Sequence, residues 1–232
     1  MKCRGWPLIL ALALAGCGED EAATPEAEAA RAVPPPPAEI TGPERHILAF
    51  GDSLFAGYQV GERESYPAQL EAALRGRGIN ARVTNAGVSG DTTAAGRQRI
   101  GFVLDGLDQP PDLAIVELGG NDLLRGIPPA ETRDNLDAIL AELRQRRIPV
   151  LLMGMRAPPN LGAAFVEEFD GLYRDLAAKH GAALVPFFLE PVWDKPALIQ
   201  ADRVHPTAEG IEALVAATAD DVARALPDDA DG

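Results

Sequence analysis

The stretch HILAFGDSLFAGY, residues 46–58, indicates how this chain begins to fold. Its apolar start, residues 46–50, is typical of a buried β-strand, and the apolar residues that follow Ser53 favour a helix. A serine between a strand and a helix either caps the helix or is a nucleophile held at the edge of a sheet. The rest of the sequence has to distinguish these two roles.

The same order of strand and helix repeats along the chain. Four more segments are buried-strand candidates, at residues 81–87, 112–119, 149–155 and 182–187. Helical patterns lie at residues 65–78, 92–107, 131–147, 163–181 and 208–226. Because strands such as residues 113–118 and 150–155 are apolar without alternation, helices are expected to cover both faces of the sheet. We predict an α/β fold, a three-layer α/β/α sandwich of the flavodoxin-like type with about five parallel strands.

Polar segments follow the strands of the predicted sheet. Ser53 follows the first strand, NAGVSGDT (85–92) the second, GGND (119–122) the third and MRAPPN (155–160) the fourth. Ligand sites of such folds lie beyond the carboxyl ends of the strands. We therefore expect these segments to meet at one edge.

A serine nucleophile needs a base, and the chain has three histidines. His46 opens the first strand and lies at the wrong end of the sheet, and His180 suits the C-terminus of a helix without a further role. His205 lies in the loop before the last helix, three residues after Asp202. On a tight turn, Asp202 accepts the Nδ1 proton of His205 and leaves Nε2 to face a serine. Taken alone, this spacing also fits a loop with a helix cap.

Serine chemistry also needs donors for an oxyanion. Asn121 offers a side-chain amide, and Gly90 allows its backbone N–H to approach a substrate because no Cβ is in the way. The simpler readings are an Asx turn for Asn121 and a loop glycine for Gly90. They account for each motif alone, but not for four motifs that follow successive strands in this order.

These motifs resemble those of a known family. GDSL (51–54), SGDT (89–92), GGND (119–122) and DRVH (202–205) match the four sequence blocks of the SGNH (GDSL) hydrolases. The resemblance covers residues 45–226 and is nearest to the bacterial acyl-CoA thioesterase/lysophospholipase/arylesterase subgroup. It implies a catalytic triad of Ser53, Asp202 and His205. It also implies an oxyanion hole made by the backbone N–H groups of Ser53 and Gly90 and the side chain of Asn121, where Gly90 is preferred over Gly87 because it occupies the motif position.

The expected activity is serine esterase chemistry on carboxylic esters and possible thioesters. Loops at residues 123–129, 157–165 and 187–193 supply large apolar side chains for an acyl groove, although such residues also suit the core and rim of any α/β domain. Aryl or alkyl esters and lysophospholipids are the expected substrates. The alternatives are an O-acetyl esterase of cell-envelope polysaccharide and, from another class, a non-catalytic binding lipoprotein.

The N-terminal residues predict export and a lipid anchor. Residues 1–16 have the charged start and short apolar run of a signal peptide, and LAGC (14–17) resembles a lipobox, which implies a lipid on Cys17. An ordinary secretory signal is the alternative. Residues 17–43 are acidic and Pro-rich, as expected for a tether; residues 44–226 form the hydrolase domain, and residues 227–232 form a disordered tail. Gly18 favours an outer membrane, with the protein facing the periplasm.

The chain carries a net charge of −14, from 35 acidic and 21 basic residues. Such a surface repels nucleic acid, so we exclude nucleic-acid binding as the main function. The sequence has no HxH or HExxH grouping to hold zinc, and once the signal is removed the only cysteine would carry the lipid. We expect a monomer that needs no metal and no cofactor and binds the membrane through its N-terminal anchor.

Overall fold

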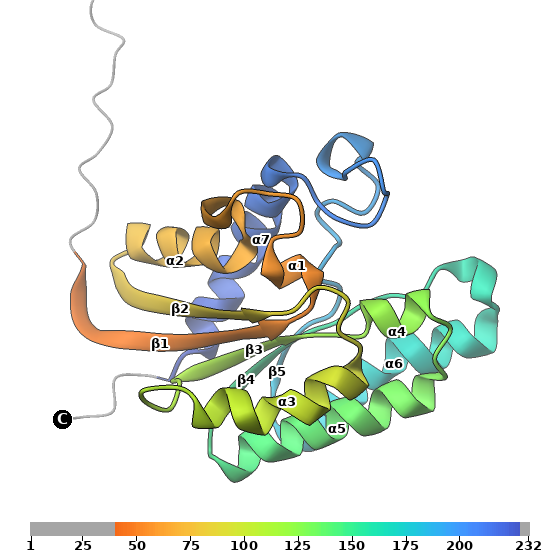
Figure 1. The fold of residues 1–232 in the computed structure, drawn as a ribbon, viewed down its shortest axis with the longest axis horizontal. Helices are drawn as coiled ribbons and strands as arrows, with labels where there is room; N and C mark the ends of the chain where they lie inside the picture. The colour runs from red at the N-terminus through yellow and green to blue at the C-terminus, as the bar shows by residue number, and fades with distance from the viewer. Residues whose placement is uncertain (1–39, 228–232) are drawn as a thin grey trace, which may run out of the picture. The chain divides into compact units, whose positions relative to one another are not determined.

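The computed structural model describes residues 40–227, which form a five-stranded sheet between two layers of helices (Figure 1). The strands are β1 (Thr41–Gly51), β2 (Ile79–Gly87), β3 (Leu113–Glu117), β4 (Val150–Met153) and β5 (Ala183–Val185). All neighbouring strands are parallel, in the order β2-β1-β3-β4-β5. This is the flavodoxin-like strand order, so the predicted fold class is confirmed.

Helices cover both faces of the sheet. They are α1 (Ser53–Ala56), α2 (Tyr66–Gly76), α3 (Thr93–Asp105), α4 (Gly120–Leu124), α5 (Pro129–Gln145), α6 (Ala163–His180) and α7 (Ala208–Ala225). Single 3₁₀ turns lie at Glu62–Glu64, Pro159–Leu161 and Pro196–Leu198. In Figure 1, α2 and α7 lie above the sheet, and α3, α5 and α6 lie below it. The one-turn helices α1, which was expected after Ser53, and α4, which was not predicted from the sequence, follow the carboxyl ends of β1 and β3.

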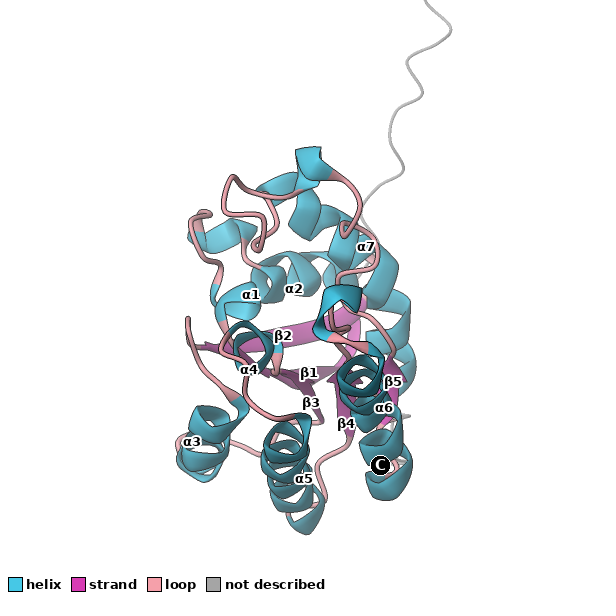
Figure 2. Cartoon of the chain, turned by 90° about the vertical axis from the view of Figure 1, so that its right-hand side faces the viewer, coloured by secondary structure: helices cyan, strands magenta, loops and turns pink. Residues whose placement is uncertain are grey.

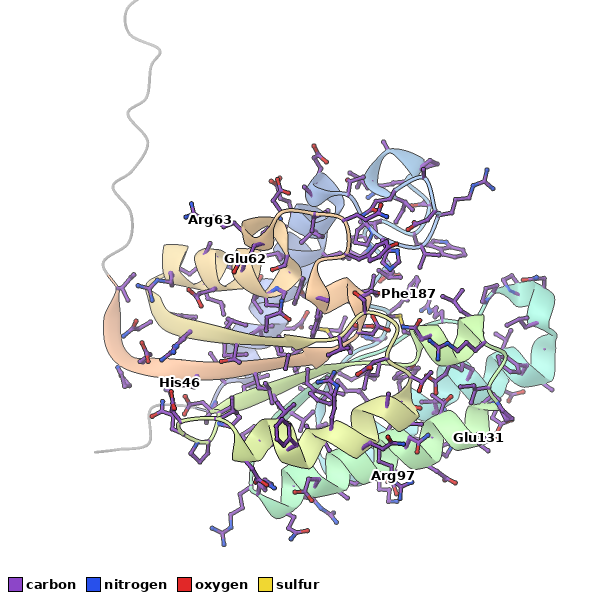
Figure 3. All side chains as sticks on the ribbon, viewed as in Figure 1. His46, Glu62, Arg63, Arg97, Glu131 and Phe187 are labelled. Atoms are coloured by element: carbon purple, nitrogen blue, oxygen red, sulfur yellow. The ribbon has the colours of Figure 1, made fainter. Side chains whose placement is uncertain are left out.

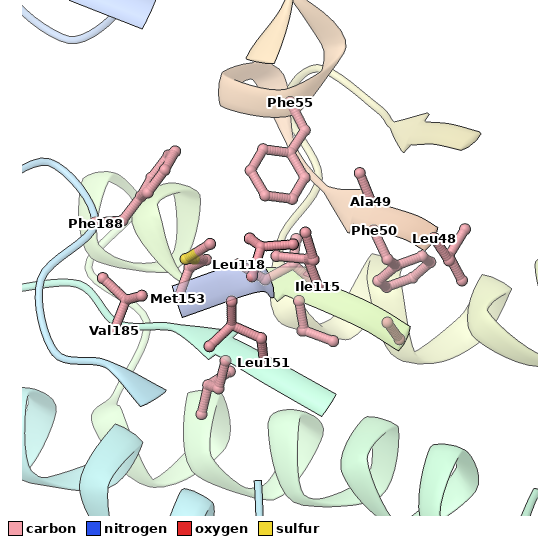
Figure 4. Close-up of a cluster of buried hydrophobic side chains, with 14 of the residues drawn as sticks. Leu48, Ala49, Phe50, Phe55, Ile115, Leu118, Leu151, Met153, Val185 and Phe188 are labelled. Carbon is pink, nitrogen blue, oxygen red and sulfur yellow. The ribbon is translucent and has the colours of Figure 1, made fainter. Parts of the chain in front are cut away.

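The core lies on both sides of the two central strands. Leu48 and Phe50 of β1 and Ile115 of β3 are completely buried, and Figure 4 shows them in one cluster that extends across the sheet to side chains of β4 and β5. Phe55 and Phe188 close the end of this cluster with rings whose centroids are 5.8 Å apart in an edge-to-face arrangement. Burial of this apolar surface fixes the ends of the strands, and hence the segments that follow them.

Several element boundaries differ from the expectation by a few residues, and two of them have a clear reason. The first strand begins at Thr41, which pairs with Ile79, so residues 41–43 belong to β1 rather than to the expected tether. The last strand ends at Val185 because Pro186 has no N–H to donate to a ladder.

The predicted signal at residues 1–16, Cys17, and the tail after residue 227 lie outside the described residues. Within residues 40–227, no helix has both the length and the apolar character of a membrane span.

Candidate active site

The segments predicted to meet do lie at one edge of the sheet. Figure 2 looks onto the carboxyl ends of the strands, with α1 and α4 near the viewer. Phe187, on the segment after β5, lies at this edge, whereas His46 lies toward the other end (Figure 3). His46 is paired there with Glu44 at 2.7 Å, so it is not available to a serine at the carboxyl edge.

Ser53, His205 and Asp202 form a continuous line of hydrogen bonds. The Oγ of Ser53 is 2.8 Å from Nε2 of His205, across 152 residues of sequence. On the other side of the ring, Nδ1 of His205 is 2.7 Å from Oδ2 of Asp202. Since an ionised carboxylate only accepts hydrogen bonds, Nδ1 carries the proton and Nε2 is left to accept the serine hydroxyl.

The side chain of Asp202 also shapes the turn that holds His205. Its Oδ1 accepts the backbone N–H groups of Val204 and His205 at 2.9 and 3.0 Å. Arg203, between Asp202 and Val204, has a φ of +61°, a conformation that non-glycine residues adopt at a cost. Burial alone would raise the pKa of Asp202, but the hydrogen bonds from the His205 ring and the two N–H groups outweigh it and lower the pKa to about 2. The carboxylate is therefore ionised at every pH relevant to the protein.

His205 is held by two further residues. The ring of Tyr58 lies against its imidazole, with centroids 4.3 Å apart. The side chain of Gln200 donates to the carbonyl of Tyr58 at 3.0 Å, and its backbone N–H donates to the carbonyl of His205 at 2.8 Å. These contacts tie the loop before α7 to the segment that follows α1, so the base is positioned from both sides.

The helix-capping role considered for Ser53 is filled by its neighbour, Asp52. Asp52, not Ser53, caps α1: its Oδ1 accepts the N–H of Leu54 at 3.1 Å. Its Oδ2 accepts the Nδ2 amide of Asn121 at 2.9 Å. Burial raises the pKa of Asp52, and the hydrogen bonds from Leu54, Asn121 and Glu117 act against that rise. The hydroxyl of Ser53 is thus left free to bond His205.

The three expected oxyanion donors surround the same space. Ser53, Gly90 and Asn121 line one cleft. Gly90 has a φ of +86°, which favours glycine, and its carbonyl accepts a hydrogen bond from Arg125 at 2.8 Å. In the described part of the chain, the backbone N–H groups of Ser53 and Gly90 donate to no other group, so both remain available to a substrate oxygen.

The cleft is large and mainly apolar. Its volume is about 990 Å³. The apolar lining includes Leu123, Leu124, Met155, Phe187, Leu189 and Trp193. Arg156 and Arg203 also line it, and the guanidinium of Arg156 is 5.2 Å from the ring centroid of Phe187. A cleft of this kind accommodates an acyl chain together with a polar group.

One buried polar residue at this edge was missed in the sequence analysis. Glu117 ends β3, is fully buried, and accepts the N–H of Asp52 with Oε2 at 3.4 Å. Burial and the neighbouring charge of Asp52 raise its pKa well above the usual value for glutamate. The available signal was an acidic residue inside the otherwise apolar run LAIVEL (113–118).

The third histidine, His180, does not line the cleft. His180 hydrogen-bonds Asp137 at 2.7 Å on the helical layer of α5 and α6, away from the cleft residues. Among residues 40–227, no cluster of three or more histidine, cysteine or acidic side chains is arranged to hold a metal ion.

Comparison with known proteins identifies the family. Residues 49–213 match the model of the GDSL-like lipase/acylhydrolase family. The chain belongs to this family.

Its relatives are esterases. Esterase TesA of Pseudomonas aeruginosa is 40% identical over 160 residues, which is 69% of this chain and 79% of that protein. Thioesterase 1/protease 1/lysophospholipase L1 of Escherichia coli is 37% identical over 163 residues, 70% of this chain and 76% of that protein. The crystal structure of AlinE4, an SGNH-hydrolase family esterase, is 68% identical with a TM-score of 0.69 and covers 81% of this chain and 100% of its own. The chain is therefore a serine esterase, and the non-catalytic alternative is excluded.

Proposed function

We propose that Ser53 is the nucleophile, His205 the general base and Asp202 the residue that orients the base. The observation that carries this assignment is the unbroken line from Asp202 through His205 to Ser53, with contacts of 2.7 and 2.8 Å. His205 takes the proton of Ser53 as its Oγ attacks the carbonyl carbon of the ester. His205 then gives that proton to the leaving alcohol, and an acyl-enzyme remains.

The second half of the reaction repeats these steps with water. His205 deprotonates the water, which attacks the acyl carbon, and the proton returns to Oγ of Ser53 as the acid leaves. In both halves the negative charge develops on the former carbonyl oxygen. The N–H groups of Ser53 and Gly90 and the side-chain amide of Asn121 are the donors assigned to that oxygen.

For the natural substrate we propose lysophospholipids or related long-chain esters. The apolar side of the cleft suits an acyl chain; Leu124 and Trp193 leave 64% and 61% of their surface exposed at its rim. Arg156 and Arg203 line the cleft without a carboxylate partner among the described residues, which suits a phosphate only a few bonds from the reacting ester. Asp194 lines the same cleft and partly offsets this charge. A short acetyl group on a sugar would leave most of the apolar surface uncovered.

The experiment is a substrate profile of the purified full chain in detergent. Activity on p-nitrophenyl esters should rise from the acetyl to the octanoyl ester, and lysophosphatidylglycerol should be a better substrate than the uncharged monoacylglycerol. Arg156→Gln should lower kcat/KM for lysophosphatidylglycerol about tenfold and leave p-nitrophenyl butyrate unchanged. Arg144→Gln, a change of an exposed arginine on α5, is the matched control. A strong preference for acetylated sugar would instead favour the polysaccharide esterase.

For location we propose a lipid anchor at Cys17 that holds the domain in the bacterial cell envelope, with the preceding residues removed as a signal. The support is the LAGC motif after a short apolar run. A single lipidated residue with several acyl chains is sufficient for stable attachment. Cys17→Ala should move the protein from the membrane fraction to the soluble fraction and abolish labelling by radioactive palmitate. Retention in the membrane would contradict the anchor.

A further inference from the structure

Glu117 lies directly behind the turn that carries Ser53. It is the last residue of β3 and is in register with Gly51, the last residue of β1. A Cβ added at Gly51 would come within 2.9 Å of Oε2 of Glu117. The carboxyl group therefore fills the space beneath Gly51 and Asp52, with none of its surface exposed.

Its surroundings suit an uncharged acid. Oε2 receives one long contact, from the N–H of Asp52 at 3.4 Å, and Oε1 has no partner in the described part of the chain. The Oη of Tyr173 donates to the carbonyl of Leu118, so it is not a donor to Glu117. A buried carboxylate without a cation or good donors is strongly destabilised.

Asp52 is the better acceptor of the two neighbouring carboxyl groups. It receives the N–H of Leu54 and the amide of Asn121, and its charge is favoured by His205. A proton on one of the two carboxyl groups would let that group donate to the other, and Glu117, which receives only one long contact, has fewer donors to stabilise a charge. The nearby phenol of Tyr173 supplies no positive charge, and the guanidinium of Arg99 donates to the carbonyl of Gly51 at 2.9 Å and pairs with Asp91 at 2.6 Å rather than with Glu117.

We propose that Glu117 is a positioning residue that stays protonated and donates its proton to the carboxylate of Asp52. Asp52 in turn holds one N–H of the Asn121 amide, and this fixes the plane of the amide. The second N–H is then directed to the oxyanion. Glu117 thus acts on catalysis through Asp52 and Asn121 and touches no substrate. This inference rests on the proposed role of Asn121, but not on the identity of the natural ester.

Two variants separate positioning from packing. Glu117→Gln keeps the length and a donor, so kcat on p-nitrophenyl butyrate should stay within about threefold of wild type. Glu117→Met keeps a similar volume without a donor, so kcat should fall about tenfold with little change in KM. Thr218→Val removes a different buried polar group, one bonded to Tyr66, and should leave kcat unchanged. Equal activity of the Met and Gln variants would overturn the proposal.

A double-mutant cycle tests the route through Asn121. In an Asn121→Ala background the amide no longer needs to be oriented, so adding Glu117→Met should lower kcat less than about twofold. A further tenfold fall would show that Glu117 acts elsewhere, for example by general packing. Thermal unfolding of every variant identifies a loss of folding, which would appear as a lowered midpoint in the Met variant.

Protonation of Glu117 has its own signature, which does not require activity. The infrared spectrum of the wild type at neutral pH should contain the carbonyl stretch of a protonated carboxylic acid, and Glu117→Gln should remove it. Its absence would contradict the proposal even if the Met variant fails to fold.

In the Met variant, the acidic limb of the pH profile of kcat should move to higher pH because Asp52 has lost a donor. If the wild type itself does not cleave the ester, the proposed function fails rather than this inference.

Discussion

Two regions of the molecule hold a histidine beside an aspartate in nearly identical pairs. At the carboxyl edge of the sheet, His205 bonds Asp202 at 2.7 Å, and on the helical layer His180 bonds Asp137, also at 2.7 Å. The difference lies on the other ring nitrogen. Nε2 of His205 faces Ser53, whereas Nδ1 of His180 is buried without a partner among the described residues. A histidine–carboxylate pair is therefore not sufficient for catalysis, because a third group must complete the line.

The second difference is the position of the carboxylate. Asp202 is three residues from His205 and bonds the backbone of the same turn, so acid and base are ordered together. Asp137 belongs to α5, and it joins the end of α6 through both Lys179 and His180. The first pair orients a proton acceptor, whereas the second ties two helices together.

The largest effect on kcat is expected from removing the hydroxyl of Ser53, the group that completes the line of hydrogen bonds from Asp202 and His205. Ser53→Ala should lower kcat by about 10⁵- to 10⁶-fold, the loss typical of a serine nucleophile. His180→Gln should leave kcat within twofold, since its ring reaches no substrate. Steady-state hydrolysis of p-nitrophenyl butyrate measures both changes, and labelling by a fluorophosphonate should disappear only in the Ser53 variant. Comparable losses of kcat in the two variants would show that the two histidine–aspartate pairs do not differ in function.

Replacing the aspartate of each pair by asparagine should also have very different effects on kcat. Asp202→Asn turns an acceptor into an amide that stabilises the wrong His205 tautomer, so kcat should fall about 10⁴-fold. Asp137→Asn should not change kcat at all. The comparison is made above pH 6, where the wild-type Asp202 is ionised because its pKa is about 2. A mild effect of Asp202→Asn would mean that another group orients the imidazole.

Glu117 sharpens the comparison because it is a carboxyl group with no cation beside it. Its folded-state pKa is raised, so between the unfolded and folded pKa values the unfolded chain has lost a proton that the folded chain keeps. Stability must then fall as pH rises, by roughly 1.4 kcal/mol per pH unit within that window. Glu117→Gln should remove this fall. Urea denaturation from pH 5 to pH 9 measures the free energy of unfolding of both proteins. The difference between Glu117→Gln and the wild type should shift in favour of the variant as pH rises. The same pH dependence in both proteins would contradict a raised pKa.

The smallest effect should come from the helix-linking pair. Hydrogen bonds from Lys179 and then His180 lower the pKa of Asp137. A lowered carboxyl pKa gives stability above the unfolded value that is lost as pH falls through the folded value. Asp137→Asn should cost about 1 kcal/mol or less at neutral pH, and less still in high salt, because the group is partly exposed. The denaturation midpoint at two salt concentrations measures it. A loss of several kcal/mol would mean that this pair is part of the core.

The sequence was informative where local rules act. The alternation of strand-like and helical segments located all five strands. The order of the motifs brought Ser53, Asn121 and His205 to one edge, because parallel strands share the direction of their carboxyl ends. The start of β1 at Thr41 was not predictable, because residues 41–43 contain glycine and proline and pair only through their neighbour β2. The contribution of Glu117 was also missed, since an acid in an apolar strand shows its partner only when the chain is folded.

The turn at residues 202–205 has a consequence for how this enzyme can be altered. Asp202 and His205 lie within four consecutive residues, and one contact between distant parts of the chain, from Ser53 to His205, completes the triad. Because Gln200 holds the segment directly before the turn, a change in which esters enter is better made in a more distant loop of the cleft, such as the one that carries Trp193. A change that displaces the start of α7 would instead move His205 away from Ser53 and abolish hydrolysis.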